Sequence, residues 1–217
     1  MTLDLFTEPS TEPAPPETFA PGAVLLRAFA LKDENAILAA IGQVAAAAPF
    51  RQMETPGGFR MSVAMTNCGA LGWVTDRSGY RYTSEDPQSG RAWPAMPAIF
   101  RALAQSAAAQ AGFAGFEPDA CLVNRYQPGT RLTLHQDRNE KDFAQPIVSV
   151  SLGIPAVFLF GGPKRADRCA RLRLLHGDVV VWGGPARLRF HGVMPLAPAV
   201  HPLQGAQRIN LTLRRAG

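Results

Sequence analysis

Two histidines and one aspartate have the residue types and spacing to hold a metal ion. His135 and Asp137 stand two residues apart in the run Leu-His-Gln-Asp. Alternate residues of a strand point to the same side, so both side chains can reach one ion. His191, which follows the alternating residues 187–190, can supply a third ligand. Two imidazoles and one carboxylate with open positions are typical of non-haem iron(II) oxygenases, although a zinc hydrolase can use the same set. The other two histidines of the chain, His176 and His201, lack such partners and are predicted to be structural.

The last predicted strand carries polar residues on one face. Alternation in the run Arg-Ile-Asn-Leu-Thr-Leu-Arg places four of them together, Arg208, Asn210, Thr212 and Arg214. Burying two arginines is costly unless anions accompany them, and a dicarboxylate such as 2-oxoglutarate supplies two. Arginine forks match carboxylates in bidentate geometry. The alternative is an exposed edge strand whose charges protect it from aggregation.

Short strands are predicted to position both groups. A first strand is expected at Ala23–Phe29, and turn signals such as Pro128-Gly129 and Gly183-Gly184 separate eight later ones. On the strand that contains Ser149 and Ser151, these residues alternate with apolar ones, as on a half-buried strand. The eight predicted strands are Ala120–Tyr126, Leu132–His135, Ile147–Leu152, Val157–Phe160, Leu172–Leu175, Val179–Trp182, Leu188–His191 and Ile209–Leu213.

Two helices are predicted ahead of these strands. The first runs from about Asp33, which can cap it, to Ala48, and the second from about Pro94 to Ala111, closed by Gly112. Apolar residues recur on one face of each, at Ile37, Ile41, Val44 and Ala48 and at Ile99, Leu103 and Ala107. Two helices before many strands indicate an α+β, mostly β fold, a double-sheet jelly roll with helices covering one side.

Residues 50–93 differ from the rest in composition. Glycines are interspersed with aromatic residues, among them Phe59, Trp73, Tyr80, Tyr82 and Trp93, and with five arginines, Arg51, Arg60, Arg77, Arg81 and Arg91. Such a segment is typical of short strands and mobile loops that offer stacking surfaces and phosphate partners.

The length and charge of the chain limit the classes of protein to which it can belong. The 217 residues fit one catalytic domain over 22–217, with a loose leader over 1–21 from which Leu3, Leu5 and Phe6 could dock onto the body. All 22 Lys and Arg follow the leader, which holds four of the 17 acidic residues, and a basic body suits nucleic acid. No apolar stretch is long enough to span a membrane. Three scattered cysteines, Cys68, Cys121 and Cys169, favour a cytoplasmic protein with reduced thiols.

Longer motifs resemble the AlkB family of nucleic-acid demethylases, from about Gly22 to Arg215. Besides the metal and C-terminal motifs, the matching runs are Phe50–Met53, Thr55–Gly58, Met61–Gly69, Pro118–Leu122, Asn124–Tyr126, Ile147–Gly153 and His176–Gly184. The resemblance implies a double-stranded β-helix core over 118–217, two supporting N-terminal helices, and a nucleotide-recognition lid over 50–93.

The resemblance also implies a role for each matching residue. His135, Asp137 and His191 would hold iron. Arg208 would pair with the distal carboxylate of 2-oxoglutarate, assisted by Asn124 and Tyr126, while Asn210 and Arg214 would serve the end nearer the metal. Trp73 would stack on the flipped base, with His135 on its other face. Four further positions would grip the nucleotide or its backbone, namely Thr55, Met65, Tyr80 and Arg165.

The implied reaction is oxidative removal of methyl groups from 1-methyladenine and 3-methylcytosine, with Fe(II), 2-oxoglutarate and O2, releasing formaldehyde, succinate and CO2. Both lesions block base pairing, so such a base is cheap to extrude, most of all from single-stranded DNA. Double-stranded DNA and RNA are further expected substrates, and a monomer is expected. One departure stands out: two places beyond the aspartate ligand the family pattern has an acidic residue, and this chain has Asn139.

Two other functions remain open at this point. The first is the same oxygenase chemistry on a small molecule or protein, against which the Arg- and aromatic-rich segment argues. The second is a non-catalytic nucleic-acid-binding module with a decayed iron site, against which the complete triad and the C-terminal strand argue.

Overall fold

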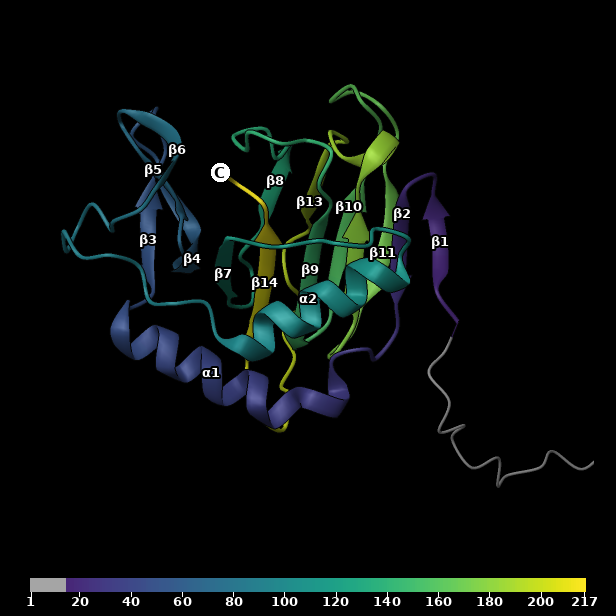
Figure 1. The fold of residues 1–217 in the computed structure, drawn as a ribbon, viewed down its shortest axis with the longest axis horizontal. Coiled ribbons are helices and arrows are strands. Elements are labelled where there is room, and N and C mark those ends of the chain that lie inside the picture. The colour runs from purple at the N-terminus through teal and green to yellow at the C-terminus, as the bar shows by residue number, and fades with distance from the viewer. Residues whose placement is uncertain (1–14) are drawn as a thin grey trace, which may run out of the picture.

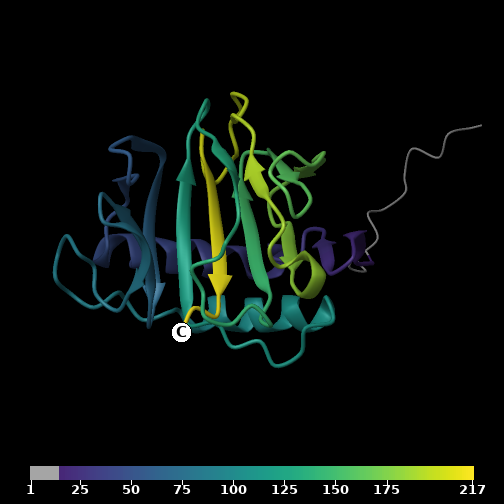
Figure 2. The same cartoon turned by 90° about the horizontal axis from the view of Figure 1, so that it is seen from above.

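The computed structural model describes residues 15–217, in which two β-sheets face one another. The large sheet has the strand order β1 (Glu17–Ala20), β2 (Ala23–Leu26), β12 (Val179–Trp182), β9 (Ile147–Gly153), β14 (Arg208–Arg214), β7 (Ala120–Tyr126), β4 (Arg60–Gly69) and β3 (Arg51–Glu54). The small sheet has the order β11 (Ala170–Leu174), β10 (Ala156–Phe160), β13 (His191–Val193) and β8 (Leu132–His135). This confirms the jelly roll, with β14 running between its neighbours β7 and β9 (Figure 2).

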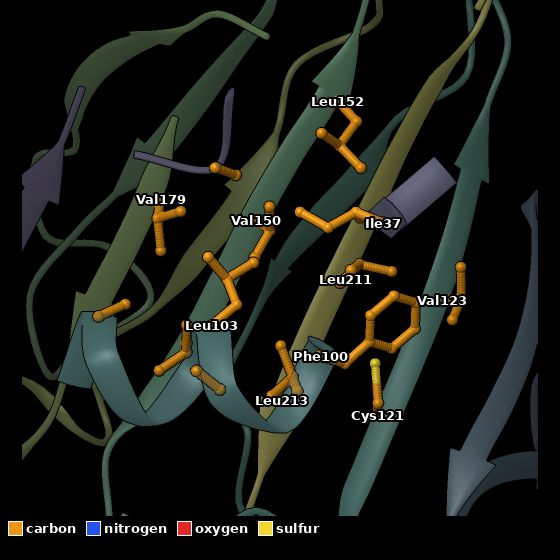
Figure 3. Packing of buried hydrophobic residues seen from close by; sticks show 14 of the residues in the cluster. Ile37, Phe100, Leu103, Cys121, Val123, Val150, Leu152, Val179, Leu211 and Leu213 are labelled. Atoms are coloured by element: carbon orange, nitrogen blue, oxygen red, sulfur yellow. The ribbon is translucent and has the colours of Figure 1, made fainter. Parts of the chain in front are cut away.

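Two helices cover the outer face of the large sheet, α1 (Glu34–Ala47) and α2 (Ala98–Gln110) (Figure 1). Ile37 of α1 and Phe100 and Leu103 of α2 pack against strand residues such as Val150 and Leu211 (Figure 3). Both helices arise from the predicted apolar faces. The second begins four residues later than expected, because Pro97 is extended and precedes the first helical turn. Asp33 lies at the start of α1 but makes no side-chain capping bond there.

Strands β5 (Gly72–Asp76) and β6 (Gly79–Thr83) form a separate two-stranded hairpin. It lies with β3 and β4, the last two strands of the large sheet, at one side of the molecule, so the β-rich segment 50–93 extends that sheet and adds the hairpin to it (Figure 1). The Asn67 side chain holds the start of the hairpin by bonding the backbone N–H and carbonyl of Trp73, both at 3.0 Å. Within the described residues, no helix is long and apolar enough to cross a membrane.

Three sequence expectations need correction. The leader expected over 1–21 contains a strand, since Glu17–Ala20 pairs with β2, while residues 1–14, including Leu3, Leu5 and Phe6, lie outside the described part. The strand expected at Leu188–His191 instead begins at His191, because Gly184–Ala186 forms a 3-10 turn before it. Ser149 and Ser151 are buried, since the inner face of β9 is covered by the small sheet.

Candidate active site and metal centre

The two sheets bring the three predicted metal ligands together. His135 ends β8 and His191 begins β13, and the two residues are direct partners across these strands. Asp137 lies just beyond β8, and its Oδ1 is 3.7 Å from His135 Nε2 while its Oδ2 is 3.7 Å from His191 Nε2. One ligand atom from each residue lies within 4.8 Å of the others. The geometry therefore suits a single ion held by two imidazoles and one carboxylate.

Both imidazoles are oriented as metal ligands should be. The Nδ1–H of His135 donates to the Thr133 carbonyl at 2.9 Å, and that of His191 donates to the Arg189 carbonyl at 3.0 Å. Each Nε2 is thereby left with its lone pair turned toward Asp137. A backbone acceptor behind the ligating ring is the usual support of a metal-bound histidine. The residues present thus fit an iron(II) ion.

The electrostatics keep these ligands in their metal-binding forms. Burial and the neighbouring His135 lower the pKa of His191 to about 3, so its ring stays neutral. Burial opposes ionisation of Asp137, but Arg214 and the two histidines hold the pKa of its carboxyl below the ordinary value. Arg214 donates two hydrogen bonds to one Asp137 oxygen, at 3.0 and 2.7 Å. Arg214, which is expected to bind the end of the cosubstrate nearer the metal, therefore also orients the metal ligand Asp137.

We expect the metal-free protein to lose stability as the pH falls from 7 to 5. The folded pKa of His191 is about 3 against an ordinary 6.5, so below pH 6.5 the unfolded chain binds a proton that the folded chain refuses. Each pH unit below 6.5 then costs about 1.4 kcal/mol, which gives about 2 kcal/mol at pH 5. Urea denaturation with a chelator, at both pH values, measures this loss. In His191→Asn the loss of unfolding free energy between the two pH values should be smaller by about the same amount. Equal losses in the two proteins would mean that His191 is not the group responsible.

Arg208 lies at the other end of the site and has no carboxylate partner among residues 15–217. Its side chain is 1% exposed, and its Nη2 donates to Ser151 at 2.8 Å. Its Nε and Nη1 have no hydrogen-bond partner among the described residues, and neither has the buried Asn124 Oδ1. The Tyr126 ring centroid lies 5.0 Å from the guanidinium carbon. A buried cation with two free donors calls for a carboxylate, which fits the distal end of 2-oxoglutarate.

The rest of the polar face of β14 lies between Arg208 and the metal ligands. Asn210 donates to Ser149 Oγ at 2.8 Å and Thr212 donates to Asn210 at 3.0 Å. Since β14 is paired on both sides, it is an interior strand, and the alternative of a charged edge strand is wrong. The shared polar face predicted from the alternation is therefore confirmed. It is polar because it lines a buried site between the sheets.

One cavity of about 520 Å³ connects these groups with the lid. Trp73 and Tyr80 stack at 5.7 Å between ring centroids on one side of it. Arg165 lies over the Phe190 ring, with 5.3 Å from its guanidinium carbon to the centroid. A larger cavity of about 740 Å³ beside Arg125 contains none of the predicted site residues. The predicted site residues that line the smaller cavity are Thr55, Met65, Trp73, Tyr80, Asn124, Tyr126, His135, Asp137, Asn139, Arg165, His191, Arg208, Asn210 and Arg214.

Several arginines of the lid segment 50–93 form ion pairs within the protein and are therefore less available to bind phosphate than the sequence suggested. Three of the five are paired within the protein: Arg51 with Asp86, Arg77 with Glu54, and Arg81 with Asp76. Arg60 and Arg91 have no carboxylate partner among the described residues. Acidic residues of the same segment therefore pair with three of the five arginines, and the phosphate partners expected for this segment stay a prediction.

Sequence reasoning missed a buried ionic cluster behind the metal ligands. Glu140 and Arg187 have side chains that are 1% and 3% exposed and lie 3.1 Å apart. Tyr82 of β6 donates to the other oxygen of Glu140 at 2.6 Å. A glutamate within the charged run Asp-Arg-Asn-Glu-Lys-Asp carries no sequence signal of burial, so only the tertiary contacts reveal this cluster.

Comparisons with known proteins agree with this geometry. The profile of the 2OG-Fe(II) oxygenase superfamily matches residues 22–214. The chain is 57% identical over 217 residues to the alpha-ketoglutarate-dependent dioxygenase AlkB of Escherichia coli, covering 99% of this chain and 98% of that protein. It is 31% identical over 133 residues to the tRNA demethylase abh1 of Schizosaccharomyces pombe, covering 61% and 44%. Among solved structures, OsALKBH1 matches with a TM-score of 0.80 and 28% identity, covering 93% of this chain and 100% of that one.

Proposed function

Because the chain belongs to the AlkB family of the 2OG-Fe(II) oxygenase superfamily, we propose that it oxidatively demethylates N-alkylated bases of nucleic acids. It is an iron(II)- and 2-oxoglutarate-dependent dioxygenase. The observation that carries the proposal is the cavity in which the triad and the aromatic lid residues meet Arg208, whose Nε and Nη1 have no partner in the described part of the chain. In this proposal the lesions are 1-methyladenine and 3-methylcytosine, and the enzyme acts as a cytoplasmic monomer.

The side chains divide the work between two ends of the cavity. His135, Asp137 and His191 would hold the iron, and Arg208 would hold the distal carboxylate of 2-oxoglutarate. When bound, the iron supplies the chemistry that uses O2 and 2-oxoglutarate to hydroxylate the N-methyl group, which leaves as formaldehyde beside succinate and CO2. Burial keeps water from Arg208, and Arg214 keeps Asp137 ionised and oriented.

The lid would supply base recognition. Trp73 and His135 line the same cavity, so a flipped base could lie between them. Four further residues line that cavity and could grip the nucleotide, namely Thr55, Met65, Tyr80 and Arg165. Methylation on the pairing edge weakens the duplex at that base, and a single strand has no pairing to lose. We therefore propose single-stranded DNA as the preferred substrate, with double-stranded DNA and RNA also accepted.

Mass spectrometry of products from a panel of methylated oligonucleotides tests the function. We expect iron-dependent loss of one methyl mass from 1-methyladenine and 3-methylcytosine, fastest in single strands. Free methylated nucleosides serve as the control for a small-molecule oxygenase. Equal turnover of nucleosides and oligonucleotides, or succinate release without any demethylated product, would contradict the proposal.

Trp73→Ala is expected to impair nucleic-acid turnover more than the uncoupled oxidation of 2-oxoglutarate. Trp73 contacts Tyr80 and Asn139 rather than the cosubstrate end, so its loss should remove base stacking, worth about 1–3 kcal/mol. The measurement compares kcat/KM for a methylated oligonucleotide with the rate of succinate release in its absence. A parallel fall of both rates would instead make Trp73 a residue of the hydrophobic core.

Asn139→Asp is expected to favour 1-methyladenine relative to 3-methylcytosine. Trp73 Nε1 donates to the Asn139 amide oxygen at 3.4 Å, which turns the amide N–H groups away from that contact. In the family pattern the acidic residue at this position can accept from the exocyclic amine of adenine, so a carboxylate would offer a charged acceptor to cationic 1-methyladenine in particular, a difference of about 1 kcal/mol. The neighbouring Glu140 does not line the cavity and cannot supply that charge.

The check is kcat/KM for both lesions in the native enzyme and in Asn139→Asp. We expect the ratio of 1-methyladenine to 3-methylcytosine to rise about fivefold if the difference is about 1 kcal/mol. An unchanged ratio would mean that residue 139 does not sense the charge of the base.

A further inference from the structure

Glu140 is a buried carboxylate that the proposed reaction does not use. Its side chain is 1% exposed, and it does not line the substrate cavity. One oxygen lies 3.1 Å from Arg187 Nη2, and the other lies 3.4 Å from Arg214 Nε. A buried charge is retained at a cost unless its partners compensate it. The contacts of Glu140 link the β5–β6 hairpin to the arginines that bind Asp137.

On one side, Glu140 is bound to the recognition hairpin. The Tyr82 hydroxyl of β6 donates to Glu140 at 2.6 Å. Burial holds the pKa of this phenol well above its ordinary value, so it remains a donor. The adjacent Asn139 accepts from Trp73 of β5. Both strands of the hairpin are thus attached to the segment that follows the metal ligand Asp137.

On the other side, Glu140 shares an arginine with that ligand. Arg214 donates to Asp137 through Nε and Nη2, and its Nε also lies near Glu140. Arg187 joins the same pair, since its Nη1 donates to the Asp137 backbone carbonyl at 2.7 Å while its Nη2 contacts Glu140. If the hairpin lifts, Glu140 loses its neutral donor and draws more strongly on Arg214, which then holds Asp137 less firmly.

We propose that the Tyr82–Glu140 pair is a latch that couples the seating of the β5–β6 hairpin to the position of the metal ligand Asp137. Glu140 is then a positioning residue, acting on Asp137 through Arg214 and Arg187. Metal at the triad and a seated hairpin favour one another, since coupling between two sites is reciprocal. For nucleic acid under the hairpin the consequence rests on the function proposed above: oligonucleotide and metal bind with positive cooperativity.

The first test needs no substrate. Hydrogen exchange of residues 72–83 is measured in the full chain with and without Co(II), a probe that does not turn over. In the native protein we expect Co(II) to slow exchange in the hairpin at least about fivefold, the lower end of ordinary coupling. In Tyr82→Phe, which removes one hydroxyl and leaves both arginine contacts of Glu140, this slowing should fall below about twofold.

Tyr80→Phe is the matched control. It removes a phenolic hydroxyl from the same strand, at a side chain that is 48% exposed and whose hydroxyl makes no hydrogen bond to the described residues. Its hairpin should remain as responsive to Co(II) as that of the native protein. Glu140→Gln is a second variant, but it leaves Arg187 without a carboxylate, so its thermal midpoint must be reported beside its exchange.

The second test adds an oligonucleotide. The Co(II) affinity, followed by its visible absorption, should rise about fivefold when a methylated single strand saturates the native protein, and should not change in Tyr82→Phe. Equal Co(II) protection of the hairpin in native protein and Tyr82→Phe would overturn the latch, as would no protection in either. A native protein that shows the protection but never demethylates an oligonucleotide would overturn the proposed function and leave the latch standing.

Discussion

Replacing any one of His135, Asp137 and His191 by alanine is expected to abolish demethylation. Each supplies one of three ligand atoms that lie within 4.8 Å of one another, and two remaining ligands cannot hold the ion in the same geometry. The loss should exceed the roughly 10–100-fold that removal of a supporting residue costs a metal site. The measurement is formaldehyde release from a methylated oligonucleotide, together with iron content after dialysis.

The folded state should survive these replacements to different degrees. His135 is the most exposed ligand, with a side chain 33% exposed, so its alanine variant should unfold close to the native midpoint. Asp137→Ala removes the main acceptor of Arg214, which keeps Glu140 as a partner, so this variant should be less stable but folded. His201→Ala is the control histidine, because it stacks on His176 away from the triad and should retain activity. Iron-dependent turnover in any ligand variant would show that the triad is misassigned.

Arg208→Ala is expected to weaken 2-oxoglutarate binding by about 2–5 kcal/mol, the usual cost of truncating one partner of a buried charge pair. This corresponds to a loss of affinity of about 30-fold to several thousand-fold. The cause is the pair of free donors, Nε and Nη1, that the buried guanidinium directs at no residue of the described chain. Titration of 2-oxoglutarate into the iron-loaded, oxygen-free protein measures the change.

Arg208→Ala should not reduce the stability of the protein when 2-oxoglutarate is absent. An unpaired buried cation is unfavourable, and burial lowers the pKa of Arg208. The cosubstrate-free Arg208→Ala variant should therefore unfold no earlier than the native protein, although it binds 2-oxoglutarate far more weakly. Arg208→Lys, which keeps the charge but loses the fork, should fall between the two in affinity. An affinity within twofold of native would move the distal carboxylate site elsewhere.

Local patterns were enough to predict most elements of the jelly roll. The strands at Ala120–Tyr126, Leu132–His135 and Val179–Trp182 were predicted with the bounds that the structure has. Each alternates or is wholly apolar, and each is bounded by residues that turn the chain, so its conformation depends little on distant partners. The alternation before His191 predicted a strand that the structure does not have. A 3-10 turn at Gly184–Ala186 precedes this segment, and Arg187 is buried because it donates to Glu140.

The residues that could bind metal and cosubstrate were predictable from the chain alone, because a two-residue spacing and an alternating strand specify a shared face without any knowledge of the fold. Tertiary contacts were needed to show that His191 lies opposite His135, that β14 is interior, and that Arg208 is buried with no carboxylate partner among residues 15–217. The same contacts place Glu140 outside the lining of the cavity, against Arg187, Arg214 and Tyr82. Burial and charge pairing depend on which distant segments meet, and a charged residue has the same local pattern whether it faces water or a buried partner.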